Sequence, residues 1–223
     1  MRNRLTFIPI FLFLIGCTKN ISDTERAEII KQLQEIKTID QKYAGIPPQE
    51  LFDQYGNEKA WQLFTAKRDS VAIENQNKIK ELYKKYGYLG YAQIGKEASG
   101  DFWISIQHAD NDVAFQKEML AALKTEIEKD NASKAEYALL EDRVAVNLGQ
   151  KQRFGTQLTY NSKGQAIPKI GIKDSLNVDK LRTEYDLPTL LEYYNMMTLS
   201  HFEMNKEYLK QLGITEPYLY PQE

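Results

Sequence analysis

Apolar residues recur at helical spacing over most of the chain. The first such segment follows Ser22, which forms a capping box with Glu25, and its apolar side is Ile29, Ile30, Leu33, Ile36 and Ile39. Gly45 and the two prolines after it end this helix. The same spacing predicts further helices over residues 57–86, 98–108, 112–129, 133–149, 178–185 and 189–212.

The pattern changes to short strand-like runs in one place. Residues 154–160 and 165–170 flank a turn, Asn161-Ser162-Lys163-Gly164, and predict a β-hairpin. Residues 87–97 hold three glycines and predict a loop. The fold class is therefore mainly α with one small β-hairpin. We expect residues 22–212 to form a single helical domain, followed by an irregular tail over 213–223.

The N-terminal residues resemble a secretory signal. Arg2 and Arg4 precede an apolar run over residues 5–15, which is too short to span a bilayer. Pro9 and this positive start disfavour the alternative, a buried N-terminal helix. We expect residues 1–16 to be a signal peptide.

The end of this segment, Leu14-Ile15-Gly16-Cys17, resembles a bacterial lipobox. The resemblance implies cleavage before Cys17 and lipid on its sulfur, with residues 17–21 as the lipidated cysteine and tether. Several acyl chains on one residue anchor a protein stably. In related signals a non-acidic residue such as Thr18 favours the outer membrane. We expect a lipid-anchored protein of the cell envelope, in the outer membrane facing the periplasm.

Composition excludes several function classes. The chain has 29 basic and 31 acidic residues, and loss of Arg2 and Arg4 with the signal leaves a net charge of −4. Without a basic stripe, nucleic acid is not an expected partner. Cys17 is the only cysteine, so its lipidation removes any thiol nucleophile. The two histidines are not paired, and no cofactor motif is present. We expect no metal and no cofactor.

Asp142 and Arg143 interrupt a segment, residues 137–146, that is otherwise apolar nearly all round. Such a helix is usually buried, so these charges either pair with structural partners or line a wet cavity. His108 ends another apolar helix. It is a structural residue or the chain's best general acid or base, since imidazole exchanges protons near neutral pH.

Four more polar residues lie near these in the sequence. Gln152 and Gln157 surround the hairpin entrance, whereas Asp174 and Arg182 flank the next turn. Ordinary turn chemistry and a surface ion pair between Asp179 and Arg182 are the alternative roles. We expect one cleft between the buried helix and the hairpin, holding a small anionic or zwitterionic ligand and formed by His108, Asp142, Arg143, Gln152, Gln157, Asp174 and Arg182.

Three sequence blocks also resemble a bacterial family of unknown function, DUF6624. They are Gln107-His108-Ala109-Asp110-x-Asp112, Tyr137-Ala138-Leu139-Leu140-x-Asp142-Arg143-Val144, and Gln152-x-Phe154-Gly155-Thr156-Gln157. The resemblance covers residues 69–187 and implies a shared domain with a shared polar cluster. The family often has tyrosine at Phe154 and arginine at Ala44, so an arginine contact to a ligand would be absent here. The resemblance brings no known reaction, substrate or cofactor.

Two functions fit these observations. The first is a binding or accessory lipoprotein with a polar pocket. The second is an enzyme of hydrolase or lyase type, in which His108 is the acid or base, Asp142 orients it, and Arg143 or Arg182 holds an anionic group. The sequence has no serine-nucleophile elbow, Walker loop, dinucleotide fingerprint or zinc motif. This absence favours the binding function.

Replacing Cys17 by serine should abolish lipidation, because serine lacks the sulfur that receives the lipid. We expect Cys17→Ser to lose labelled palmitate and to leave the membrane fraction. Metabolic labelling and cell fractionation measure both effects. Absence of label from the wild-type protein would contradict the prediction.

Overall fold

The computed structural model describes residues 21–221 of the chain. The predicted signal peptide and Cys17 lie outside the described residues. Within them, the chain forms eight helices and one antiparallel β-hairpin, so the prediction of a mainly α fold is confirmed. In the same part of the chain, no helix combines the length and apolar character needed to cross a bilayer.

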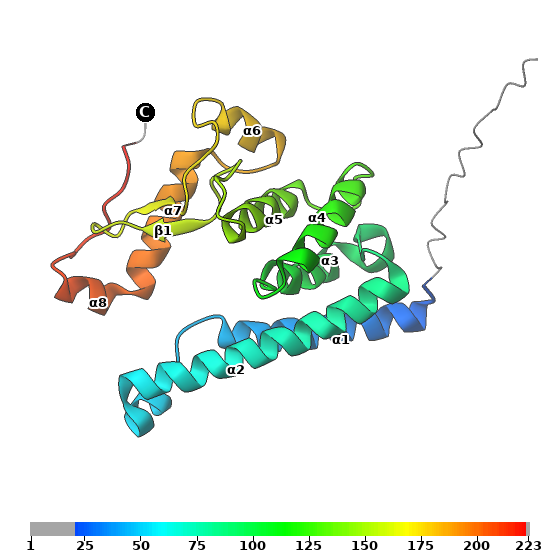
Figure 1. Cartoon of the computed structure of the whole chain (residues 1–223), viewed down its shortest axis with the longest axis horizontal. Helices are drawn as coiled ribbons and strands as arrows, with labels where there is room; N and C mark the ends of the chain where they lie inside the picture. The colour runs from blue at the N-terminus through cyan, green and yellow to red at the C-terminus, as the bar shows by residue number, and fades with distance from the viewer. Residues whose placement is uncertain (1–20, 222–223) are drawn as a thin grey trace, which may run out of the picture.

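Two long helices, α1 (Asp23–Tyr43) and α2 (Gln49–Tyr86), lie side by side as one layer (Figure 1). The capping box predicted at Ser22 is present. The expected helix over 57–86 is there, but a helical segment precedes it. Gly56, at φ 71°, joins the two segments with non-helical backbone. Glycine takes this conformation without the steric cost other residues meet.

Helix α3 (Tyr91–Gln107) packs on this layer, and α4 (Val113–Ile127) and α5 (Lys134–Asn147) pack on α3 and on each other (Figure 1). The predicted loop over 87–97 is wrong from Tyr91 onward, where α3 begins, although Gly95, at φ 80°, keeps non-helical backbone inside this helix. Asn131 accepts hydrogen bonds from the backbone N–H groups of Tyr91 and Ala92, at 2.9 and 2.7 Å. The helix start thus depends on a residue 39 positions away, which local spacing does not reveal.

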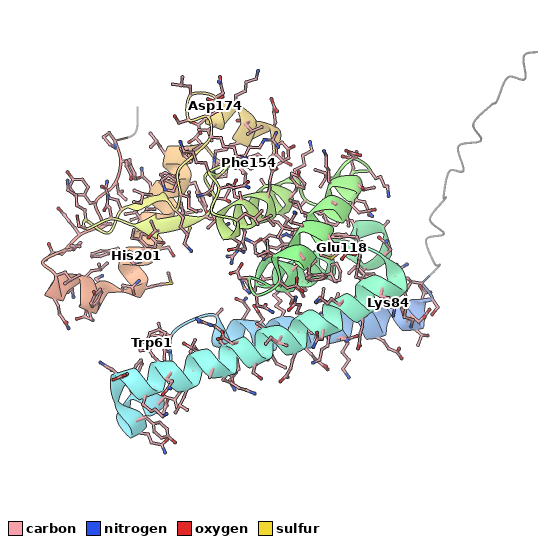
Figure 2. The ribbon with its side chains drawn as sticks, in the orientation of Figure 1. Trp61, Lys84, Glu118, Phe154, Asp174 and His201 are labelled. Atoms are coloured by element: carbon pink, nitrogen blue, oxygen red, sulfur yellow. The ribbon has the colours of Figure 1, made fainter. Side chains whose placement is uncertain are left out.

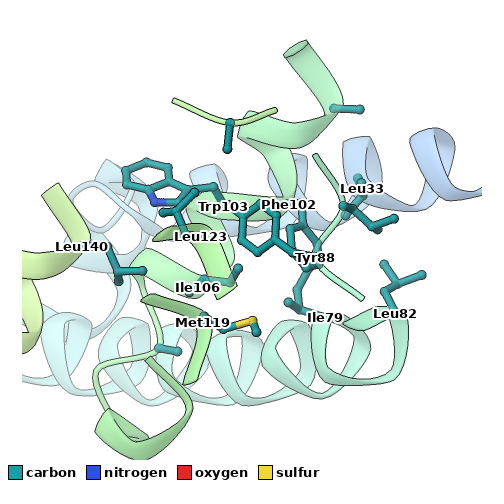
Figure 3. Close-up of a cluster of buried hydrophobic side chains, with 14 of the residues drawn as sticks. Leu33, Ile79, Leu82, Tyr88, Phe102, Trp103, Ile106, Met119, Leu123 and Leu140 are labelled. Atoms are coloured by element: carbon teal, nitrogen blue, oxygen red, sulfur yellow. The ribbon is translucent and has the colours of Figure 1, made fainter. Parts of the chain in front are cut away.

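Helix α3 lies at the centre of the core. Its Phe102 and Ile106 are fully buried in a cluster to which the other helices of this region contribute Leu33, Ile79, Met119, Leu123 and Leu140 (Figure 3). Burying one such side chain contributes about 1.5–3 kcal/mol. This packing fixes the C-terminal end of α3, where His108 follows.

The hairpin and three helices form the C-terminal part. Strand β1 (Leu158–Tyr160) pairs with β2 (Ala166–Pro168), so both strands are shorter than predicted. Helix α6 (Val178–Glu184) follows. The predicted helix over 189–212 is divided at Asn205 into α7 (Leu190–Met204) and α8 (Lys206–Gln211).

The tail after Gly213 is irregular over its described residues, as predicted. The Asn195 side chain nevertheless fixes it by bonding both the backbone N–H and the carbonyl of Tyr220. That residues 22–212 unfold as one cooperative unit stays a prediction.

Glu136 at the start of α5 should make stability depend on pH. It lies against Gly100 of α3, and burial raises the pKa of its carboxyl from 4.5 to about 7. The folded chain therefore holds the proton more tightly than the unfolded chain. The free energy of unfolding should fall by about 3 kcal/mol as pH rises from about 4.5 to about 7.

Urea denaturation at pH 4.5, 6 and 7.5 measures this effect. We expect Glu136→Gln to lose the pH dependence and the exposed Glu118→Gln to keep it. If the free energy of unfolding depended on pH equally in wild type and in Glu136→Gln, the Glu136 carboxyl would not be the cause of the pH dependence.

Candidate functional site

A cleft of about 410 Å³ lies between the C-terminal half of α3, helix α5, the hairpin and α7. A second cavity of about 790 Å³ lies beside it, against α1 and α2. His108, Asp110 and Arg143 line both. These three residues are therefore the place where the two cavities meet.

His108 forms a dyad with Asp40 of α1. Its Nδ1 lies 3.0 and 2.9 Å from the two carboxylate oxygens of Asp40. A carboxylate accepts, so Nδ1–H donates, and the lone pair of a neutral ring is then on Nε2. The Asp40 side chain is 8% exposed and that of His108 is 31% exposed. The dyad has a buried carboxylate and an accessible imidazole.

Sequence reasoning missed Asp40. A signal was present, since Asp40 continues the buried face of α1 that Ile29, Leu33 and Ile36 form at helical spacing. A carboxylate in an apolar stripe needs a partner. The expectation that Asp142 orients His108 is wrong, because Asp40 occupies that position.

Arg143 pairs with Asp110 and not with Asp142. Its Nη1 lies 2.7 Å from an Asp110 oxygen, and Asn147 donates to the other oxygen at 2.8 Å. The Nε of Arg143 is buried and has no hydrogen-bond partner within residues 21–221. The guanidinium therefore keeps one buried donor unpaired, on a residue that lines both cavities.

Asp142 is fully buried and faces the other way, toward the segment before β1. Its carboxylate accepts from the backbone N–H groups of Arg153, Phe154 and Thr156, at 2.7, 3.1 and 2.9 Å, and from the Thr156 hydroxyl at 3.0 Å. Hydrogen bonds to a charged acceptor are strong and replace its hydration. They also divert residues 153–156 from strand pairing, which explains the short β1. Asp142 therefore has a structural role.

Gln152 and Arg182 also support the cleft wall from behind. Gln152 is buried and exchanges two hydrogen bonds with the backbone of Gln157, at 2.8 and 2.7 Å. Arg182, fully buried, donates to the carbonyl oxygens of Phe154 and Pro188, each at 2.6 Å. Burial lowers the pKa of the Arg182 guanidinium. Neither residue lines the cleft.

Asp174 lies elsewhere. It accepts from the backbone N–H groups of Leu176 and Asn177 before α6, and the Asn177 side chain lowers the pKa of its carboxyl. In the view of Figure 2 it lies beyond Phe154, away from α1 and α2. The expected convergence is therefore partial. Of the seven predicted residues, the cleft receives His108, Arg143 and Gln157.

Two further cleft residues carry buried polar atoms without partners in the described part of the chain. Trp103 Nε1 is a donor and Gln107 Oε1 an acceptor, and the residues lie one turn apart on α3. They are 8% and 4% exposed. Each unsatisfied buried group costs about 1–3 kcal/mol, so each calls for an explanation such as a ligand. Trp103 was not predicted from the sequence as a site residue. Gln107 was named only as part of the block that begins Gln107-His108, without a role of its own.

The cleft can thus hold a polar ligand through donors on α3 and α5 and an acceptor on α3. His108, whose Nε2 carries the lone pair of a neutral ring, also lines this cleft and adds a proton acceptor. Across residues 21–221, His, Cys, Asp and Glu side chains form no group of three suited to a metal ion.

Comparisons with known proteins give one result. A family model described as "Family of unknown function (DUF6624)" matches residues 31–202. Searches of curated proteins and of solved structures find no match.

Removing the Asp142 carboxylate should destabilise the fold, because it leaves three N–H groups and a hydroxyl without their acceptor. We expect Asp142→Ala to lower the free energy of unfolding by about 3–5 kcal/mol. Asp142→Asn, which keeps one acceptor oxygen, should lose less. Chemical denaturation measures both.

Arg143→Ala is the matched control on the next residue. Its partner Asp110 is half-exposed, so we expect a loss of about 1 kcal/mol or less. His108→Ala, in contrast, leaves the buried Asp40 carboxylate without its imidazole partner, so it should destabilise the fold more than Arg143→Ala does. If Arg143→Ala destabilised the fold as much as Asp142→Ala, the division between a structural and a cleft residue would fail.

Proposed function

The chain belongs to DUF6624, a family of unknown function, and from this premise we propose that it is a lipid-anchored cell-envelope protein whose cleft binds a small anionic or zwitterionic ligand. The envelope location rests on Arg2, Arg4, the apolar run and Cys17. The ligand proposal rests on the cleft.

The observation that carries the binding function is the pair of unpartnered atoms on Trp103 and Gln107. A ligand that offers one acceptor and one donor would satisfy both. The Arg143 Nε adds a second free donor at the same wall. Arg143 and Lys169 line this cleft against the single carboxylate of Asp110. That balance favours a ligand with a negative group.

Acid–base catalysis is the second candidate, and the dyad of His108 and Asp40 favours it. Nε2 would take a proton from water or from a substrate group, while the Asp40 carboxylate stabilises the imidazolium that forms. Arg143 would stabilise developing negative charge. The reaction would be a hydrolysis or an elimination.

Trp103 provides a direct test of binding. The chain has two tryptophans, so Trp61→Phe leaves Trp103 as the single indole reporter. We expect its fluorescence to change saturably with at least one of acetate, inorganic phosphate and glycine, and not with the dication putrescine. Arg143→Gln should weaken that binding about 10- to 100-fold, the effect of losing a charged hydrogen bond.

Arg26→Gln, on the exposed face of α1, is the control and should bind like the parent. If none of the four compounds changed the Trp103 signal, or if both arginine variants weakened binding equally, the binding proposal would be overturned. Conversion of a bound compound by wild type but not by His108→Ala would favour the catalytic function.

A further inference from the structure

The two adjoining cavities, together called the groove, extend from the hairpin to α2. Each has the volume of an ordinary ligand pocket. They meet at His108, Asp110 and Arg143. One end of the groove is at Lys169 on the hairpin, and the other is at Asp69 of α2. An extended occupant would fill both parts.

The two ends differ in charge. On the hairpin side, Arg143 and Lys169 outnumber Asp110. On the α2 side, three carboxylates outnumber the two guanidinium groups; the residues there are Asp40, Asp69, Asp110, Arg68 and Arg143. Opposite excess charges at the two ends match an occupant with a carboxylate at one end and an ammonium group at the other.

The hairpin part of the groove offers groups that suit an amide. Every peptide unit has one N–H donor and one carbonyl acceptor. The unpartnered Gln107 Oε1 and Trp103 Nε1 are the complementary acceptor and donor, one turn apart on one helix. Apolar contacts are available beside them from Leu139, Leu158 and Met197.

We propose that the groove binds a short peptide with free ends, its amino terminus toward Asp69 and Asp40 and its carboxyl terminus toward Lys169. This assignment rests on the proposed binding function and names its ligand class. The peptide crosses the dyad at His108, so the same pose would present a backbone amide to Nε2.

Tri-alanine tests the assignment against three matched compounds. Two are its N-acetyl and C-terminal amide forms, each of which lacks one end charge. The third is 6-aminohexanoate, which has both charges and no amide. With Trp103 as reporter in Trp61→Phe, we expect tri-alanine to bind most tightly, and each matched compound about 10-fold or more weakly.

Variants at the two ends test the orientation. Lys169 and Asp69 are exposed, so their replacement should leave the fold intact. In Lys169→Gln, tri-alanine and its amide should bind equally. In Asp69→Asn, tri-alanine and its N-acetyl form should bind equally. Lys163→Gln, on the same hairpin but outside the groove, should retain the wild-type preferences.

The outcomes separate this inference from the proposed function. If acetate, phosphate or glycine bound but tri-alanine bound no more tightly than the matched compounds, the peptide assignment would be overturned and the binding function would stand. If no compound of either set bound, both would be overturned. Discrimination that persisted in Lys169→Gln and Asp69→Asn would overturn the orientation.

Discussion

The Asp142 carboxylate is buried on α5 and is held by three backbone N–H groups and one hydroxyl. A buried carboxylate has a large desolvation cost, so these donors must remain in place for the fold to be stable. They all belong to residues 153–156, whose path is thereby fixed. Arg182 holds the Phe154 carbonyl from the opposite side. The hairpin, and with it one wall of the cleft, depends on this anchored segment.

Asp40 makes a comparable connection at the other wall. It joins α1 to the end of α3 through His108, 68 positions later in the chain. Trp103 and Gln107 lie on the same helix end, so the dyad and the unpartnered atoms are positioned by one packed element. A site on a helix fixed by its core is held more rigidly than one on a loop. This rigidity suits both binding and proton transfer.

Apolar spacing was sufficient to predict most helices, because burial of one face determines them. It failed where partners are distant, as at Tyr91, whose helix start needs Asn131. The candidate site followed the same rule. The sequence identified the polar blocks. It did not show that Asp142 faces the segment before β1 while the adjacent Arg143 faces the cleft. A helix turns about 100° per residue, and only the tertiary structure shows what lies on each side. At Asp40 the apolar spacing did give a signal, its place on the buried face of α1, but not the identity of its partner His108.

The opposite orientations of Asp142 and Arg143 also constrain how α5 can change in evolution. Loss or gain of one residue between the Ser133 cap and Asp142 would rotate both side chains by about 100°. The carboxylate would leave its four donors, and the guanidinium would leave Asp110. Substitution at position 143 alters only the face toward the cleft, so the polar groups of the cleft wall can change there while the fold is kept. The length of the helix before Asp142, in contrast, is fixed.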